Sequence, residues 1–176
     1  MIQKDLDQFY TKPEIAKLFV ETVNSLVGLD NFDVVIEPSA GTGNIFQYLP
    51  EGSLAFDLEP KTDGIVKMDW FDYNYDILKS PKSRIAVIGN PPFGTGYMNP
   101  LAKGFFNHAS KFAHAEVIAF IVPAKYHTSW KVHKQLDDDF GLYYSKVLPE
   151  NSFIRDGKPH DVNCCMQIWS RKPLGK

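Results

Sequence analysis

An unbroken apolar run in the segment EVIAFIVPA, residues 116–124, is the feature that most constrains the fold of this chain. A strand at a protein surface alternates apolar and polar side chains, whereas a continuously apolar strand is typical of a parallel sheet that is covered on both faces. Strand and helix patterns also alternate along the rest of the sequence. Together these features predict an α/β fold with helices on both faces of a sheet.

The individual elements are predicted from hydrophobic periodicity and turn residues. Strands are expected within residues 32–38, 53–60, 64–73, 84–90, 116–124, 140–149 and 162–170, and helices within 10–28, 99–115 and 128–136, with a brief helix ending at Tyr48. In the first helix, Thr11 and Glu14 have the spacing of a capping box, and Gly28 is a natural terminator. The expected inner faces of the first two long helices carry Ile15, Leu18, Phe19, Val23, Leu26 and Val27, and Leu101, Phe105, Phe112 and Ala113.

Length and composition fit one domain over residues 1–176, large enough to bury a core. No apolar run is long enough to span a membrane, and the N-terminus lacks the pattern of a signal peptide. Cys164 and Cys165 are adjacent in an expected strand, so they point to opposite faces and are poor disulfide partners. This favours a reducing, cytoplasmic setting. No cluster of residues has metal-ligand spacing.

The net charge of −2 is divided unevenly along the chain. Residues 1–90 contain 8 Lys and Arg against 14 Asp and Glu, whereas residues 91–176 contain 11 against 7. The positive second half is where an anionic partner would bind, although uneven charge is also common by chance in a short chain.

Residues suited to ligand binding follow several of the expected strands. Ligands of open α/β sheets bind beyond the carboxyl ends of the strands, and such ends carry the segments EPSAGTGN, DLEP, MDWF, NPPFGTG and PAKYHTSW. In the first segment, Gly41 and Gly43 let the backbone approach a ligand closely, but no P-loop lysine follows. Asp57 ends the second strand, where a carboxylate can accept hydrogen bonds from ribose hydroxyls. We therefore expect one binding site at this edge of the sheet.

The series EPSAGTGN, FDLEP, MDWF and NPPF resembles the motif series of class I S-adenosylmethionine-dependent methyltransferases, and more narrowly of the amino-methylating group that acts on adenine N6. The segment QFYTKPEIA is similar to the N-terminal cofactor motif of that group, although Lys12 separates a Thr and a Pro that are adjacent in many members. The resemblance covers about residues 3–170. It implies a three-layer, Rossmann-like sheet of about seven strands, mostly parallel with an antiparallel last strand, and S-adenosyl-L-methionine as cofactor.

The positions of these motifs imply a role for each matching residue. Glu37 and the glycine-rich turn would surround the methionine moiety, Asp57 would hold the ribose, and Asp69 would accept a hydrogen bond from the adenine amino group of the cofactor. Trp70 or Phe71 would cover the adenine ring. The full set of expected cofactor-binding residues is Tyr10, Thr11, Glu37, Ala40, Gly41, Gly43, Asp57, Leu58, Asp69, Trp70 and Asn90.

Asn90, Pro91, Pro92 and Phe93 are the expected catalytic residues. An exocyclic aromatic amine is a poor nucleophile because its lone pair is delocalised into the ring. The side-chain oxygen of Asn90 and the backbone carbonyl of Pro91 can accept hydrogen bonds from the two N–H groups of the amine and so orient its lone pair toward the methyl group. The paired prolines hold the backbone rigid, and Phe93 would stack on the target base.

The expected substrate is a single-stranded nucleic acid, or a base flipped out of a duplex. Lys125 begins the basic stretch KYHTSWKVHK. If the strand at 140–149 is parallel to the others, the loop ENSFIRDGKPHD offers Phe153, Arg155 and Lys158 to bases and phosphates. The same loop is equally compatible with a solvated surface.

Three functions are compatible with the sequence. The leading one is adenine-N6 methylation of DNA or RNA. A second is methylation of a protein glutamine, by a family with a similar Asn-Pro-Pro-aromatic signature that usually has Tyr in place of Phe93 and a separate recognition domain. The third is a non-catalytic partner subunit, although such subunits usually lose the motif residues. No segment of residues 1–176 is left for a separate target-recognition domain, so target choice is expected from loops, substrate shape or a partner subunit.

Overall fold

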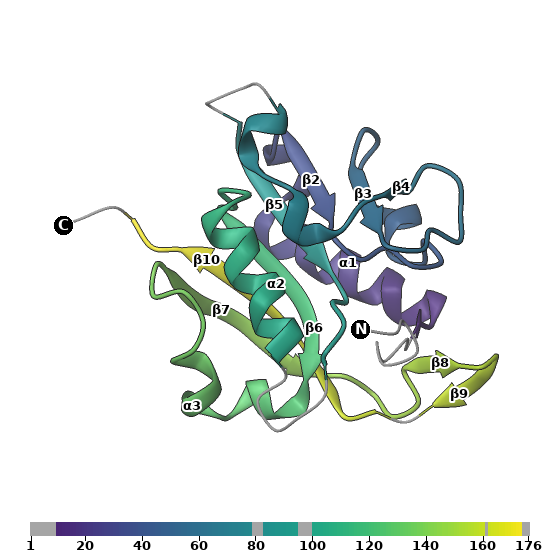
Figure 1. Ribbon diagram of the computed structural model, residues 1–176. Coiled ribbons are helices and arrows are strands. Elements are labelled where there is room, and N and C mark those ends of the chain that lie inside the picture. The colour runs from purple at the N-terminus through teal and green to yellow at the C-terminus, as the bar shows by residue number, and fades with distance from the viewer. Residues whose placement is uncertain (1–9, 79–82, 95–99, 161, 174–176) are drawn as a thin grey trace.

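A seven-stranded sheet forms the middle layer of the molecule, and helices cover its faces (Figure 1). The computed structural model describes residues 10–78, 83–94, 100–160 and 162–173. The strands of this sheet are β2 (Val34–Glu37), β3 (Leu54–Asp57), β4 (Val66–Lys67), β5 (Ile85–Gly89), β6 (Val117–Pro123), β7 (Phe140–Val147) and β10 (Cys164–Arg171). Their order across the sheet is β4-β3-β2-β5-β6-β10-β7.

The directions of the strands confirm the expected fold class. Strands β4, β3, β2, β5 and β6 pair in parallel, whereas β10 runs antiparallel to both β6 and β7. It follows that β7 is parallel to β6, so its carboxyl end lies at the same edge as those of the other parallel strands. The sheet is therefore Rossmann-like, with one antiparallel strand that is the last in the chain.

Helices lie on both faces of this sheet. In Figure 1, α2 (Pro100–Lys111) lies in front of the sheet and α1 (Pro13–Val27) lies behind it. Along β6, Ile118 and Phe120 join the core beneath α2, whereas Ala119 and Ile121 join the core beneath α1. This two-sided burial explains why the run at the centre of the sheet is apolar throughout. The shorter helices are α3 (Trp130–His133) and the 3₁₀ helices η2 (Leu29–Asn31), η3 (Phe46–Tyr48), η4 (Trp70–Asp72), η5 (Tyr75–Leu78) and η6 (Ala124–His127).

A second, three-stranded sheet lies beside the carboxyl edge and consists of β1 (Tyr10–Thr11), β8 (Phe153–Arg155) and β9 (Lys158–His160), in the order β1-β8-β9. Strands β8 and β9 form a hairpin that projects beyond the end of β6 (Figure 1). Strand β1 pairs antiparallel with β8, with Thr11 opposite Phe153. The sequence pattern predicts a loop at β8 and β9 and includes residues 10–11 in the first helix. Both predictions are wrong here, because strands of two or three residues are too short to show alternation.

The start of α1 differs from the predicted capping box. Lys12 is the N-cap residue and makes no side-chain capping bond. Thr11 instead lies in β1, where pairing with β8 holds it in an extended conformation. Thr11 and Glu14 therefore form no capping box. At the other end, Gly28 terminates α1 in a left-handed conformation, as predicted.

Some predicted inward side chains are exposed. Phe112 is 54% exposed, because α2 ends at Lys111 and helical spacing no longer applies beyond it. Leu18 and Leu26 lie at the margin of the buried face of α1 and are each 38% exposed. The predicted helix at 128–136 is reduced to the single turn of α3, the brief helix ending at Tyr48 is the 3₁₀ helix η3, and residue 99 lies outside the described residues.

The two cysteines follow the alternation of β10. Both are buried free thiols. Cys165 belongs to the core beneath α2 and Cys164 to the core beneath α1, so the predicted placement on opposite faces is confirmed.

Candidate active site

A cavity of about 680 Å³ lies at the carboxyl edge of the parallel strands. Its walls are β1, the segments that follow β2, β3, β4 and β5, and the first turns of α2. These segments are far apart in the sequence, yet the cavity brings together most of the residues predicted for cofactor binding and catalysis. Those residues are Tyr10, Thr11, Glu37, Ala40, Gly41, Asp57, Leu58, Asp69, Trp70, Asn90, Pro91, Pro92 and Phe93.

The turn after β2 is held against the end of β3. Gly41 has a positive φ of 55°, and a Cβ added there would lie 3.0 Å from Cε1 of Tyr10. Its N–H donates to Oδ2 of Asp57 at 2.8 Å, while the N–H of Glu59 donates to Oδ1 at 2.8 Å. Each carboxylate oxygen has a second lone pair. Asp57 can therefore hold this turn in place and still accept hydrogen bonds from the hydroxyls of a ligand.

Glu37 is a buried carboxyl group in the cavity wall. Its side chain is 1% exposed, and Oε2 has no hydrogen-bond partner among the described residues. Burial, and in second place the negative charge of Asp57, raises the pKa of Glu37 well above its usual value of 4.5. A buried polar atom without a partner is costly. A ligand that brought a cation or a hydrogen-bond donor to Glu37 would remove this cost.

The segment after β4 contributes a carboxylate and an aromatic ring. Oδ1 of Asp69 accepts from the N–H of Phe71 at 3.0 Å and so caps η4. Trp70 is 1% exposed, and its Nε1–H donates to the carbonyl of Phe105 at 3.2 Å. Phe71, by contrast, is 43% exposed and lines the cavity. Of the two predicted aromatic covers for a ligand ring, Phe71 is the accessible one and packs edge-on against Phe105, whereas Trp70 is buried in the core.

Asn90 is held by two neighbouring segments. Its side-chain Nδ2 donates to Oγ1 of Thr11 at 3.1 Å, and its backbone carbonyl accepts from Oγ of Ser39 at 3.1 Å. The carbonyl of Thr11 accepts in turn from Nδ2 of Asn44 at 2.7 Å. Strand β1, the turn after β2 and the end of β5 are thus joined by hydrogen bonds around Asn90.

Phe93 follows the two prolines and packs into the core beneath α1. It is 7% exposed and is among the residues that line the cavity. Gly94 has a φ of 82°, and a Cβ there would lie 3.2 Å from atoms of Leu101. This close approach seats the Pro-Pro-Phe turn against the start of α2. The end of the NPPFGTG segment, residues 95–96, lies outside the described residues.

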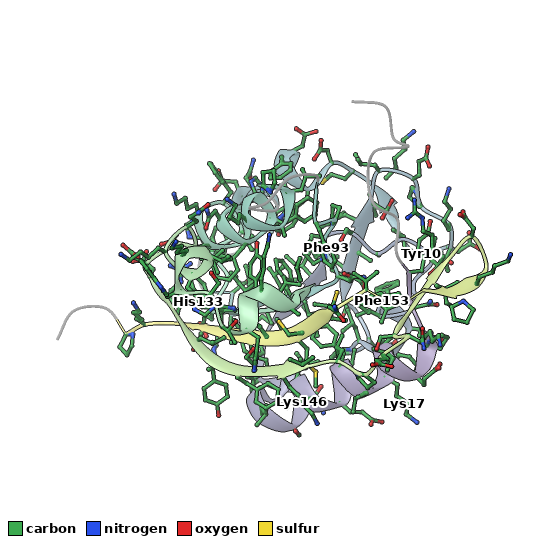
Figure 2. The ribbon with its side chains drawn as sticks, turned by 90° about the horizontal axis from the view of Figure 1, so that it is seen from below. Tyr10, Lys17, Phe93, His133, Lys146 and Phe153 are labelled. Atoms are coloured by element: carbon green, nitrogen blue, oxygen red, sulfur yellow. The ribbon has the colours of Figure 1, made fainter. Side chains whose placement is uncertain are left out.

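Of the residues predicted for substrate binding, Phe93 lines the cavity, whereas Lys125, Phe153, Arg155 and Lys158 are not among its described lining residues. Arg155 and Lys158 are exposed on the β8–β9 hairpin. Lys125 lies in η6, where partial burial, and in second place the charge of Lys103, lowers its pKa. Phe153 is 0% exposed and belongs to the core beneath α1 (Figure 2). Its ring is therefore not available to stack on a base, and we leave it out of the proposed substrate site.

The cavity also contains residues that sequence reasoning did not select. Ser39 and Asn44 hold Asn90 and Thr11, and both stand in the EPSAGTGN turn, where their polarity was a usable signal. Gly43, although predicted, is not among the described lining residues, and its nearest side chains are Thr62 and Ile65. The further lining residues are Pro38, Thr42, Ile45, Glu59, Lys67, Met68, Leu101 and Phe105.

Within the described residues, no group of three or more His, Cys, Asp and Glu side chains could hold a metal ion. The described helices include none that has the length and apolar character needed to cross a membrane.

The fold can be compared with known proteins. No protein-family model and no curated protein matches the sequence, but solved structures match the fold. A protein from Pyrococcus horikoshii with a proposed RNA methyltransferase activity has a TM-score of 0.68 at 15% identity, over 97% of this chain and 90% of its own. A Listeria monocytogenes protein assigned to the class I S-adenosylmethionine-dependent methyltransferases has a TM-score of 0.63 at 14% identity, over 100% of this chain and 64% of its own.

A third match is the M protein of the type I restriction enzyme EcoKI. It has a TM-score of 0.62 at 17% identity, over 95% of this chain and 44% of its own, so this chain spans less than half of that protein. At these identities the comparisons show a shared fold. That fold is the one used by class I S-adenosylmethionine-dependent methyltransferases.

Proposed function

We propose that this chain transfers a methyl group from S-adenosylmethionine to an exocyclic amino nitrogen, adenine N6 of DNA or RNA being the preferred target. The observation that carries the proposal is the cavity itself. It places the carboxylates of Asp57 and Asp69, the buried Glu37 and the Asn90 turn around one space of about 680 Å³, which is the size of typical small-molecule sites. The fold matches agree with this activity.

The residues of one half of the cavity fit the cofactor. Glu37 has a buried oxygen with no described partner, which suits the positively charged methionine end. Gly41 gives the close backbone approach, and Asp57 would hold the ribose through its remaining lone pairs. Asp69 and Phe71 would bind the adenine edge and face. When bound, S-adenosylmethionine supplies a methyl group on a positively charged sulfur, so the carbon–nitrogen bond forms as the carbon–sulfur bond breaks.

The residues of the other half fit an amine acceptor. The amide oxygen of Asn90 and the backbone carbonyl of Pro91 would accept hydrogen bonds from the two N–H groups of the amine and so orient its lone pair. Pro91 and Pro92 hold these acceptors because their φ angles are locked. Phe93, which lines the cavity, would contact the target base.

A nucleic acid is the proposed substrate because cationic side chains lie on elements next to the cavity walls: the β8–β9 hairpin pairs with β1, which lines the cavity, and η6 follows β6 at the same edge of the sheet. Arg155 and Lys158 on the β8–β9 hairpin, together with Lys125 in η6, would bind phosphates of a single strand or of a flipped-out nucleotide. The EcoKI M protein is part of a larger restriction enzyme, and a partner subunit could likewise supply target choice here. The two buried free thiols suit a reducing, cytoplasmic compartment.

Calorimetry and methyl transfer test the proposal together. S-Adenosylmethionine and S-adenosylhomocysteine are titrated into wild type, Asp57→Ala and Asn90→Ala, after any copurified cofactor has been removed. Wild type and Asn90→Ala are expected to bind and Asp57→Ala to bind much more weakly. Tritiated methyl transfer to single-stranded DNA and RNA oligonucleotides is expected for wild type and not for Asn90→Ala. Absence of cofactor binding by wild type would contradict the proposal. If wild type bound the cofactor but transferred methyl groups only to a glutamine-containing peptide, the substrate would be a protein glutamine rather than a nucleic acid.

A further inference from the structure

Thr11 contacts the proposed catalytic residue directly. Its side chain is 4% exposed, and Oγ1 accepts a hydrogen bond from Nδ2 of Asn90 at 3.1 Å. Its backbone carbonyl accepts from Nδ2 of Asn44 at 2.7 Å. The predicted roles for Thr11 were a helix cap or a cofactor contact. Thr11 lines the cavity, and its hydroxyl oxygen is hydrogen-bonded to Asn90.

The hairpin fixes the position of Thr11. Thr11 pairs with Phe153 across β1 and β8, and the N–H of the next residue, Lys12, donates to the carbonyl of Ser152 at 3.0 Å. Phe153 is 0% exposed, so the strand that carries it is anchored in the core beneath α1. The Thr11 hydroxyl is therefore presented to Asn90 by a rigid backbone, and it does not depend on the ligand for its position.

A carboxamide has an acceptor at one edge and a donor at the other. Because Nδ2 of Asn90 donates to Oγ1 of Thr11, the amide oxygen of Asn90 lies at the opposite edge of the carboxamide. The reversed amide would present N–H groups to the substrate amine, whose own N–H groups need acceptors. The orientation of Asn90 therefore decides whether it can activate the amine.

We propose that Thr11 is a positioning residue that sets the orientation of the Asn90 side chain for amine activation. This inference rests on the proposed function of Asn90. Thr11→Val is nearly isosteric and removes the hydroxyl, and Thr11→Ser keeps it. Thr22→Val is a matched control, because it removes a hydroxyl on the exposed side of α1 that bonds only locally to the carbonyl of Leu18.

The first measurement is the NMR signal of the Asn90 side-chain amide, identified by its loss in Asn90→Ala. Thr11→Val is expected to shift this signal and to speed its hydrogen exchange about tenfold, as for a lost hydrogen bond. Thr11→Ser is expected to keep the wild-type signal, and Thr22→Val to leave it unchanged. An unchanged Asn90 signal in a folded Thr11→Val protein would overturn the inference.

The second measurement is methyl transfer to single-stranded oligoadenylate and oligodeoxyadenylate. Thr11→Val is expected to lower kcat about tenfold or more with the KM for S-adenosylmethionine within about twofold, and Thr11→Ser to restore kcat. A raised KM for S-adenosylmethionine with an unchanged kcat would assign Thr11 to the cofactor and overturn the inference. If wild type transfers no methyl group, the proposed function fails, and the NMR signal still decides whether Thr11 orients Asn90.

Discussion

Oδ2 of Asp57 lies 2.8 Å from the backbone nitrogen of Gly41. A carboxylate at the end of β3 thereby fixes the turn that follows β2, and its other oxygen is fixed by the N–H of Glu59 at 2.8 Å. The two strand ends that form the floor of the proposed cofactor site are thus held as one unit.

Replacing this carboxylate should weaken the binding of S-adenosylhomocysteine. Hydrogen bonds to charged groups contribute about 1.5–3 kcal/mol, so Asp57→Asn is expected to reduce affinity about tenfold or more. The control is Asp63→Asn, which removes an exposed carboxylate from the following segment, outside the described cavity lining. Equal affinities for the two variants in calorimetry would rule out a ligand role for Asp57.

Gly41 is expected to tolerate no side chain. Gly41→Ala combines a positive φ with a Cβ 3.0 Å from Tyr10, whereas Gly52→Ala has a positive φ and nothing within 4 Å. The left-handed conformation alone costs about 1–2 kcal/mol. In urea unfolding, Gly52→Ala should show roughly that cost and keep ligand affinity. Gly41→Ala should cost more and also lose affinity, and identical behaviour of the two variants would contradict the packing described.

Glu37 should make the stability of the ligand-free chain fall as the pH rises. Its pKa is raised well above 4.5 by burial, so above that pH the unfolded chain releases a proton that the folded chain retains. The contribution of Glu37 to stability is therefore complete at low pH and is lost as the pH approaches its folded pKa, with a slope of up to about 1.4 kcal/mol per pH unit. Glu37→Gln should remove the contribution of Glu37 to this slope in urea unfolding above pH 4.5. Glu51→Gln, a surface change, should keep the wild-type slope.

Binding of S-adenosylmethionine should release a proton from Glu37. A cation brought to a buried carboxyl favours its ionised form and lowers its pKa. Calorimetry above pH 4.5 in buffers of different ionisation enthalpy should therefore detect proton release for wild type and none for Glu37→Gln. Equal proton release by both proteins would place the cationic end of the cofactor elsewhere.

Phe153 should contribute to stability as a core residue. Because it is 0% exposed, Phe153→Ala is expected to cost about 3–5 kcal/mol in urea unfolding. Phe112→Ala is the control, since Phe112 is 54% exposed and should cost under about 1 kcal/mol. A small effect of Phe153→Ala would mean that the hairpin is not anchored in the core.

The sheet was predictable because its central strands are buried on both faces. The apolar runs at Val117–Pro123 and Ile85–Gly89 contain no polar side chain that would face solvent. The side chains of β6 alternate between the two cores, as expected. Strand β1 was not predictable, since its partner β8 lies near the other end of the sequence. Strands β8 and β9 pair locally, but each has only three residues and shows no alternation.

The candidate site was predictable as a set of segments but not as a set of contacts. Strand ends of a parallel sheet meet at one edge, so Asp57, Asp69 and Asn90 were expected together, and all three line the cavity. Phe153 is buried because it lies in the β8–β9 hairpin, which the sequence pattern does not reveal. The polar and charged residues next to Phe153 suggested an exposed loop instead.

The pairing of β1 with β8 has a consequence for biosynthesis. A nascent chain emerges N-terminus first. Residues 10–11 of β1 therefore leave the ribosome long before β8, the strand that pairs with them, has been translated. Loop closure over such a separation is slow and comes late in folding. The Thr11 hydroxyl therefore reaches Asn90 only as the last strands assemble. A partly synthesised chain has the Asn-Pro-Pro-Phe turn without the hydrogen bond from Asn90 to Thr11 that is present in the finished protein.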